Sequence, residues 1–170
     1  MISCTLFFCL LIPFYLIIPC AILIYFNQSI IYKKLLLYLF LIVFTFDTAC
    51  YLGGKGYSKF WTTHKIVPAI SPGKSWQGFY AGFCATTTLV YLINLQHHPI
   101  NFMHIVILNL FLCIIAFTGD IFESYLKRCA GIKDSGTILP GHGGLLDRFD
   151  AILFVSYFFF IFKDYLIIVL

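Results

Sequence analysis

Oxygen-rich side chains are concentrated in one short stretch of this chain. Five of its seven carboxylates lie between positions 120 and 150: Asp120, Glu123, Asp134, Asp147 and Asp150. Two like charges about 4 Å apart repel by roughly 4 kcal/mol at an effective dielectric of about 20, and a divalent cation removes that cost. Carboxylates suit Mg²⁺, which usually takes further ligands from substrate phosphates. We therefore expect Mg²⁺ to bind here, with Asp120, Asp147 and Asp150 as first candidates and Glu123 and Asp134 as second. An ordinary capping or solvated role is the alternative for each carboxylate.

The same stretch also carries groups suited to phosphate. Its cations are Lys127, Arg128, Lys133 and Arg148. Their N–H groups can donate charge-assisted hydrogen bonds to phosphate oxygens. The run from Gly141 to Gly144 permits close approach of backbone to a ligand, and His142 lies within it. Carboxylates and cations interleaved in this way indicate a phosphoryl or nucleotidyl transfer site. A polar loop between two membrane helices, without chemistry, is the alternative.

A second polar segment reads Ser71-Pro72-Gly73-Lys74-Ser75-Trp76-Gln77-Gly78. Pro-Gly favours a turn, after which Lys74 and the hydroxyls of Ser71 and Ser75 face the start of the next helix. Helix N-termini bind anions, so this segment is predicted to bind a substrate phosphate. A helix cap with an interfacial Lys and Trp is the simpler alternative.

Composition places these segments in a membrane protein. Apolar, aromatic and Cys residues make up 61% of the chain and charged residues only 11%, whereas soluble domains are about a quarter charged. We expect an integral protein of the lipid bilayer with no separate soluble domain. Nucleic-acid binding is not expected, because no basic face exists outside the polar loops. The seven Cys include no Cys-x-x-Cys pair and are read as small buried apolar residues.

Hydrophobic runs predict the elements that position the polar segments. The expected fold is an all-α, polytopic membrane helix bundle, one domain over residues 1–170, with about five transmembrane helices. The predicted spans are Met1–Phe26, Leu35–Leu52, Trp76–Leu95, Ile100–Gly119 and Ala151–Leu170. The first is expected to be a retained helix rather than a signal peptide. Asp47 lies inside the second span, where a carboxylate is a functional candidate by default, or simply reaches the interface.

Basic residues predict the orientation. The polar loops Gly53–Ser75 and 124–150 each carry four Lys or Arg, against only Lys33 and Lys34 on the opposite side. Since cytoplasmic loops are enriched in Lys and Arg, both loops are expected on the cytoplasmic face of a multi-pass protein. Lys33 and Lys34 are the evidence against this orientation.

The stretch 124–150 has the pattern Ser-x-x-Lys-Arg, four residues, Lys-Asp-x-Gly, two residues, Leu-Pro-Gly-His-Gly-Gly-x-x-Asp-Arg-x-Asp. It resembles the signature of the phosphatidate cytidylyltransferases (CDP-diacylglycerol synthases), and the likeness extends over about residues 44–165. The resemblance implies that phosphatidic acid attacks CTP to give CDP-diacylglycerol and pyrophosphate, and it suggests a homodimer. The residues predicted to act in catalysis are Asp147, Lys133 and His142. Those predicted to bind substrate are Ser71, Lys74, Ser75, Lys127, Arg128 and Arg148.

The chain departs from that family pattern in three places. The segment from Ser71 to Gly78 resembles the family's second motif, Ser-Pro-x-Lys-Thr-x-Glu-Gly, but Gln77 stands where that motif usually has Glu. Asp47-Thr48-Ala49-Cys50-Tyr51 replaces Asp-Thr-Gly-Ala-Tyr, and fewer apolar spans precede Asp47 than in relatives. A shortened or reduced copy of the enzyme fits these departures. Two other classes remain open: a CTP-dependent lipid kinase of the polyprenol type, and a non-enzymatic membrane subunit.

Overall fold

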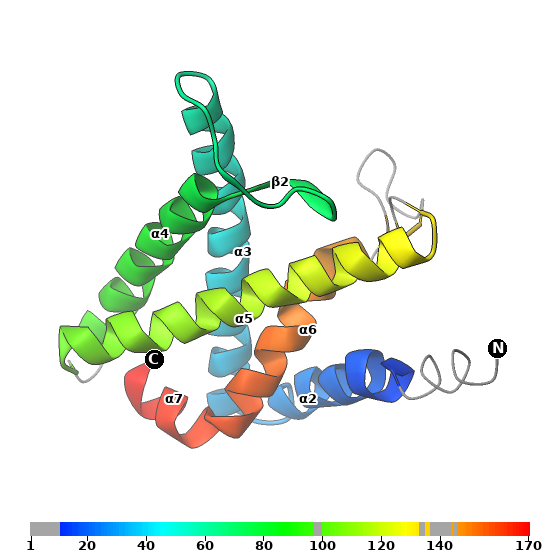
Figure 1. Cartoon of the computed structure of the whole chain (residues 1–170). Coiled ribbons are helices and arrows are strands. Elements are labelled where there is room, and N and C mark those ends of the chain that lie inside the picture. The colour runs from blue at the N-terminus through cyan, green and yellow to red at the C-terminus, as the bar shows by residue number, and fades with distance from the viewer. Residues whose placement is uncertain (1–10, 97–99, 133–134, 137–143, 145) are drawn as a thin grey trace.

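The computed structural model describes residues 11–96, 100–132, 135–136, 144 and 146–170, and every structural statement below concerns those residues. Helices dominate the structure (Figure 1). They are η1 (Pro13–Ile17), α2 (Ile18–Phe26), α3 (Ile30–Ser58), α4 (Trp76–Leu95), α5 (Phe102–Cys129), α6 (Leu146–Ile161) and α7 (Lys163–Val169), with a hairpin of β1 (Lys65–Val67) and β2 (Ser71–Ser75). The predicted all-α membrane fold is thereby confirmed, and the hairpin is an addition that the sequence analysis did not foresee.

Three helices are long and apolar enough to cross a bilayer: α3, α4 and α5. They confirm the second, third and fourth predicted spans. The predicted fifth span is broken, because α6 and α7 meet at a 90° bend and form at most one interrupted span. The first predicted span is described only in part, as the apolar helix Pro13–Phe26, because residues 1–10 lie outside the described residues. The count of five is therefore not confirmed.

Two helices extend well beyond their predicted ends. Helix α3 was expected to stop at Leu52 but continues to Ser58, so its glycine-rich end is helical rather than part of a loop. Helix α5 was expected to stop at Gly119 but continues to Cys129. A helix of 29 residues is about 43 Å long at 1.5 Å per residue, against about 30 Å of hydrocarbon. The polar ends therefore project past the apolar layer while remaining helical.

Glycines bring α3 and α4 close together, as the neighbouring cyan and green helices of Figure 1 show. A Cβ on Gly78 would lie 2.6 Å from the carbonyl oxygen of Cys50, and one on Gly82 would lie 2.8 Å from the ring of Phe46. Small residues at membrane helix interfaces allow such backbone approach. This contact fixes the start of α4 beside the carboxyl-terminal half of α3.

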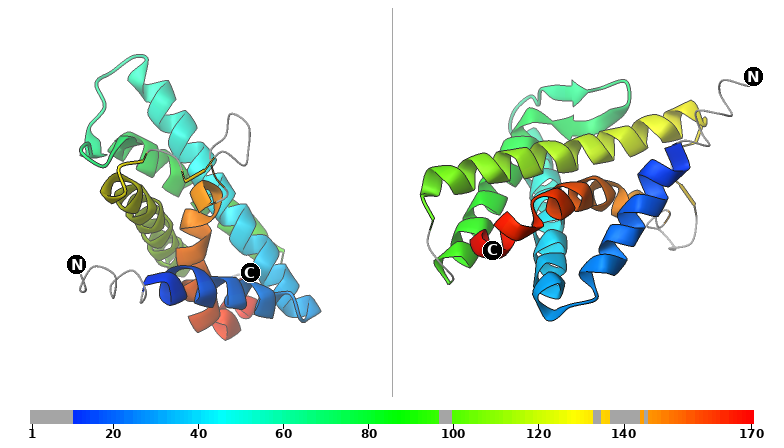
Figure 2. Two further views of the ribbon diagram at one scale, coloured as in Figure 1. Left: turned by 90° about the vertical axis from the view of Figure 1, so that its right-hand side faces the viewer. Right: turned by 90° about the horizontal axis from the view of Figure 1, so that it is seen from below.

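Helix α5 lies across the other helices and packs against α4 and α6 (Figure 2). Asn109 of α5 donates hydrogen bonds to the hydroxyls of Thr86 and Thr87 in α4, at 3.0 and 2.9 Å. Near the other end of α4, Asn94 donates to the carbonyl oxygen of Val169 at 2.9 Å. Lipid tails are as apolar as helix surfaces, so hydrophobic burial does not drive helices together in a membrane, and interhelical hydrogen bonds help to stabilise their association. These bonds connect α4 to both α5 and α7.

Candidate active site

The hairpin places Lys74 immediately before the start of α4. Ser75 is the N-cap, and its hydroxyl accepts a hydrogen bond from Gly78 N at 3.2 Å. Gln77 accepts from His64 N at 3.2 Å, and Trp76 N donates to the carbonyl oxygen of His64 at 3.0 Å. A cap of this type satisfies backbone N–H groups that the first turn of a helix leaves unpaired. The polar segment predicted to bind phosphate is therefore a fixed strand-to-helix junction.

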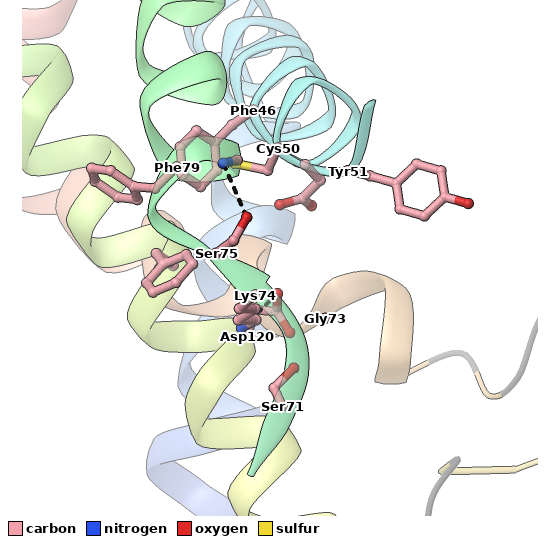
Figure 3. A pocket seen from close by; sticks show the side chains of 12 residues that line it. Phe46, Cys50, Tyr51, Ser71, Gly73, Lys74, Ser75, Phe79 and Asp120 are labelled. Atoms are coloured by element: carbon pink, nitrogen blue, oxygen red, sulfur yellow. Dashed lines mark hydrogen bonds and ion pairs between the residues drawn. The ribbon is translucent and has the colours of Figure 1, made fainter. Parts of the chain in front are cut away.

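A cavity of about 240 Å³ opens at this junction (Figure 3). Its charged and hydroxyl-bearing lining comes from α3, β2 and α5: Asp47, Ser71, Lys74, Ser75 and Asp120. The rest of the wall is formed by Cys50, Tyr51, Gly73, Gly78 and the rings of Phe46, Phe79 and Phe117. The Lys74 Nζ atom lies 2.7 Å from Asp120 Oδ2. An ion pair thus joins the second polar segment to the first carboxylate of the acidic stretch.

Lys74 lies in a partly apolar but strongly negative environment. Only 11% of its side chain is exposed, and its ammonium lies 4.8 Å from the centre of the Phe117 ring. Burial lowers the pKa of Lys74, while the charges of Asp120, Asp150 and Asp47 act in the opposite direction and favour the protonated form. The charges of carboxylates on α3, α5 and α6 therefore all act on this one lysine.

Lys127 is the centre of a second ionic cluster. Its Nζ atom lies 2.5 Å from Glu123 Oε2, one turn earlier in α5, and 2.8 Å from Asp147 Oδ1 in the first turn of α6. Asp147 also accepts from the backbone N–H groups of Ser135 at 3.0 Å and Gly144 at 2.7 Å. Charge-assisted hydrogen bonds of this kind are stronger than neutral ones. Asp147 therefore connects the start of α6 to three other described residues of the stretch 124–150: Lys127, Ser135 and Gly144.

Close packing of α5 on α6 brings the two clusters near each other. A Cβ on Gly119 would lie 2.9 Å from the carbonyl oxygen of Asp150. Asp150 is only 7% exposed, and its carboxylate accepts from Ala151 N at 2.7 Å. Asp120 and Glu123 both act on Asp150 electrostatically. The four carboxylates at the facing ends of α5 and α6 therefore share one electrostatic environment.

The remaining predicted residues are placed as follows. Arg128 donates to the carbonyl oxygen of Ile70 at 3.3 Å and so ties the end of α5 to the hairpin. Arg148 is exposed on α6. Lys133, Asp134 and His142 lie outside the described residues. Predictions about the roles of these five residues remain predictions.

The carboxylates fit Mg²⁺ by chemistry but do not form one finished set of ligands. Among the described residues, no group of three or more His, Cys, Asp or Glu side chains is arranged to hold a metal ion. Asp120 pairs with Lys74 and Asp147 with Lys127, so a lysine ammonium supplies positive charge beside each carboxylate. Glu123 is 1% exposed, and its Oε1 atom has no hydrogen-bond partner in the part of the chain that the structure describes. Such a buried oxygen suits an added cation, and the Asp120, Asp147 and Asp150 set remains a prediction.

Sequence reasoning identified most of these groups but not their connections. The Glu123–Lys127 pair has the i, i+4 spacing that predicts a helical ion pair, yet Lys127 was assigned to phosphate alone. Cys50 and Tyr51 line the cavity beside Asp47; Cys50 was noted only as a departure from the family pattern, and Tyr51 only as part of the same segment. Tyr15, which the structure places near the carboxylates, lies in a charge-free apolar run that gave no signal.

Comparison with known proteins assigns the family. The model of the cytidylyltransferase family matches residues 1–166. A phosphatidate cytidylyltransferase of Haemophilus influenzae is 38% identical over 135 residues, covering 74% of this chain and 46% of that protein. One of Staphylococcus aureus (strain COL) is 44% identical over 121 residues, covering 71% and 45%. One of Rickettsia conorii is 34% identical over 156 residues, covering 88% and 66%. The chain thus spans about half the length of the first two relatives. It belongs to the cytidylyltransferase family.

Proposed function

We propose that this chain transfers a cytidylyl group from CTP to phosphatidic acid, as the names of its relatives suggest. The observation that carries the proposal is the Lys74–Asp120 ion pair, which joins the two polar motifs in one cavity at the end of the membrane helices. A kinase of the polyprenol type would share the nucleotide, and a structural subunit would need no such site.

The proposed reaction displaces pyrophosphate. A phosphate oxygen of phosphatidic acid forms a bond to the α-phosphorus of CTP, and the bond from that phosphorus to the oxygen bridging the β-phosphorus breaks. CDP-diacylglycerol and pyrophosphate result. The attacking group is already an anion, so the site needs no strong base. It has to position two anions and neutralise their charge.

The described residues support that role in three ways. Lys74 and Lys127 provide positive charge that is already partly desolvated, at 11% and 18% side-chain exposure. The hydroxyl of Ser71 lies at the cavity and can donate to a phosphate oxygen. Asp120, Asp147 and Asp150 would hold Mg²⁺, which when bound neutralises triphosphate oxygens.

The site is proposed to face the cytoplasm, where CTP is available, and the apolar helices to cross a lipid bilayer. Eight of the eleven Lys and Arg lie in the two polar segments, 53–75 and 124–150, as the positive-inside rule expects of cytoplasmic segments. A homodimer is part of the proposal on the strength of the family resemblance alone.

CTP labelled once in the base and once at the γ-phosphate tests the reaction. The purified chain, given phosphatidic acid and Mg²⁺, is expected to place the base label in the lipid fraction and release the γ-label in pyrophosphate. Lys74→Gln should abolish the transfer and Lys59→Gln, on an exposed lysine outside the cavity, should not. The γ-label in lipid without the base label would establish the kinase instead, and no transfer of either label would contradict both enzymes.

A further inference from the structure

A second cavity lies between the first helical segment, α5 and α6. Its volume is about 160 Å³. The wall is apolar apart from two phenol groups: it is formed by Leu11, Phe14, Pro19, Phe122, Leu153 and Phe154, with Tyr15 and Tyr157. We call this second cavity the slot. It shares no lining residue with the cavity at Lys74.

Tyr15 is the unusual group in the slot. Its side chain is 6% exposed, and its hydroxyl has no hydrogen-bond partner among the described residues. Its ring packs edge-on against Phe122 at 5.3 Å and against Phe154 at 6.1 Å between ring centres. By contrast, the Tyr157 hydroxyl already donates to the carbonyl oxygen of Phe14. A buried hydroxyl without an acceptor loses the hydrogen bond that it makes in water, so the position of Tyr15 suits a ligand that brings an acceptor.

The slot adjoins the carboxylate cluster. Phe122 immediately precedes Glu123 in α5, and Phe154 lies one turn after Asp150 in α6. The charges of Asp150 and Glu123 act on the Tyr15 phenol. These carboxylates repel an anion at the hydroxyl, so a phosphate oxygen is a poor acceptor there. A neutral oxygen next to an apolar chain fits better.

We propose that this slot receives the ester-linked end of an acyl chain of the lipid substrate, and that the Tyr15 hydroxyl donates a hydrogen bond to the ester carbonyl oxygen. The inference rests on the proposed function, since it names the part of the lipid that the same site recognises. The phosphate of that lipid then lies toward Lys74 and Lys127, and the remainder of the acyl chain lies in the bilayer. Lipids without an ester carbonyl, such as dialkyl ethers and polyprenyl phosphates, lose this contact.

Paired lipids test the contact directly. Diester and diether phosphatidic acids of equal chain length are compared as substrates of the purified chain at saturating CTP. One neutral hydrogen bond predicts that the wild type prefers the ester by roughly fivefold in kcat/KM. In Tyr15→Phe the ratio should fall to about one, with the change in KM for lipid rather than for CTP. Tyr157→Phe, which removes a hydroxyl already bonded to backbone, should keep the wild-type ratio.

If Tyr15 had only a structural role, Tyr15→Phe would lower kcat/KM equally for the diester and the diether and leave their ratio unchanged. That outcome, or loss of the preference in Tyr157→Phe as well, overturns the inference. Because the Tyr15 hydroxyl makes no hydrogen bond to any described residue, its removal should not prevent folding. Thermal unfolding of Tyr15→Phe in the same detergent verifies this.

A binding measurement without CTP separates this inference from the proposed function. Radiolabelled diester phosphatidic acid is bound at equilibrium and displaced by unlabelled diester or diether. If the wild type discriminates between them and Tyr15→Phe does not, the ester contact stands even where no cytidylyl transfer occurs. If transfer occurs but neither turnover nor binding distinguishes the two lipids, the proposed function stands and the ester contact is wrong.

Discussion

Asp147 accepts hydrogen bonds from three separate donors, Lys127 Nζ and the N–H groups of Ser135 and Gly144. An Asn side chain has the same shape but replaces one acceptor oxygen with an NH₂ group, which would face these donors. It also loses the charge that pairs with Lys127. We expect Asp147→Asn to lower turnover by roughly 100-fold, from the loss of charge-assisted hydrogen bonds of about 1.5–3 kcal/mol, while the protein still inserts.

The matched control is Asp164→Asn, an exposed carboxylate on α7. Turnover per inserted molecule, measured at saturating Mg²⁺, should be unchanged by it. An Asp147→Asn enzyme within a few-fold of wild type would remove Asp147 from both the metal site and the essential ionic cluster.

Lys74 gives a pH dependence whose sign follows from its environment. Its protonated form is the one proposed to bind phosphate, and burial lowers its pKa from the ordinary value of about 10.4. Affinity for CTP should therefore fall as pH rises through a pKa below the usual lysine range. In Lys74→Arg the guanidinium stays charged throughout, so the alkaline rise in KM for CTP should disappear. An identical alkaline limb in the variant would assign it to another group.

The same residues show how far sequence reasoning reaches at this scale. Lys74, Asp120 and Asp147 were each predicted as site residues from type and spacing. Their pairing could not be predicted, because Lys74 and Asp120 lie on different elements and meet only when α5 packs across α4. Tyr15 could not be predicted for a different reason: a tyrosine in a charge-free apolar run is most often a core residue. It stands out only because its buried hydroxyl has no hydrogen-bond partner among the residues that the structure describes.

At the scale of elements, glycine was the main source of error. Gly53-Gly54-Lys55-Gly56 was expected to begin the polar loop Gly53–Ser75, and glycine is a poor helix former. The structure keeps this segment in α3. A Cβ on Gly53 would overlap the side chain of Ala81 in α4, so tertiary contact outweighs local propensity here. Helix α4 has the bounds predicted for it, Trp76–Leu95, whereas α5 was predicted to end at Gly119 and continues to Cys129.

That contact can be tested with two substitutions of the same type. A Cβ on Gly78 would lie 2.6 Å from the carbonyl oxygen of Cys50, whereas one on Gly56 would meet nothing within 4 Å. Gly78→Ala is expected to destabilise the protein by about 1–3 kcal/mol through overpacking and to reduce activity, since it displaces the Ser75 cap. Gly56→Ala should be neutral or slightly stabilising. Thermal unfolding in detergent measures both, and equal effects would show that close approach of α3 and α4 is not the cause.

For the whole molecule, the two polar regions lie at one end of the helices. Lys74 pairs with Asp120, and Arg128 donates to Ile70 in the hairpin. Figure 1 shows the hairpin beside the carboxyl-terminal half of α5. The count of basic residues had placed both loops on the same side, and the contacts agree with that part of the prediction. Which side of the membrane they face is decided by experiment.

The orientation can be measured with single cysteines in a background lacking the native seven. Ser58→Cys at the end of α3 and Ile132→Cys after α5 are exposed and lie by the site, and Asn101→Cys is exposed at the opposite end of α5. The positive-inside rule predicts that only Asn101→Cys reacts with an impermeant thiol reagent in intact cells. All three should react once the membrane is permeabilised, which controls for accessibility. Labelling of Ile132→Cys from outside would reverse the orientation and separate the site from cytosolic CTP.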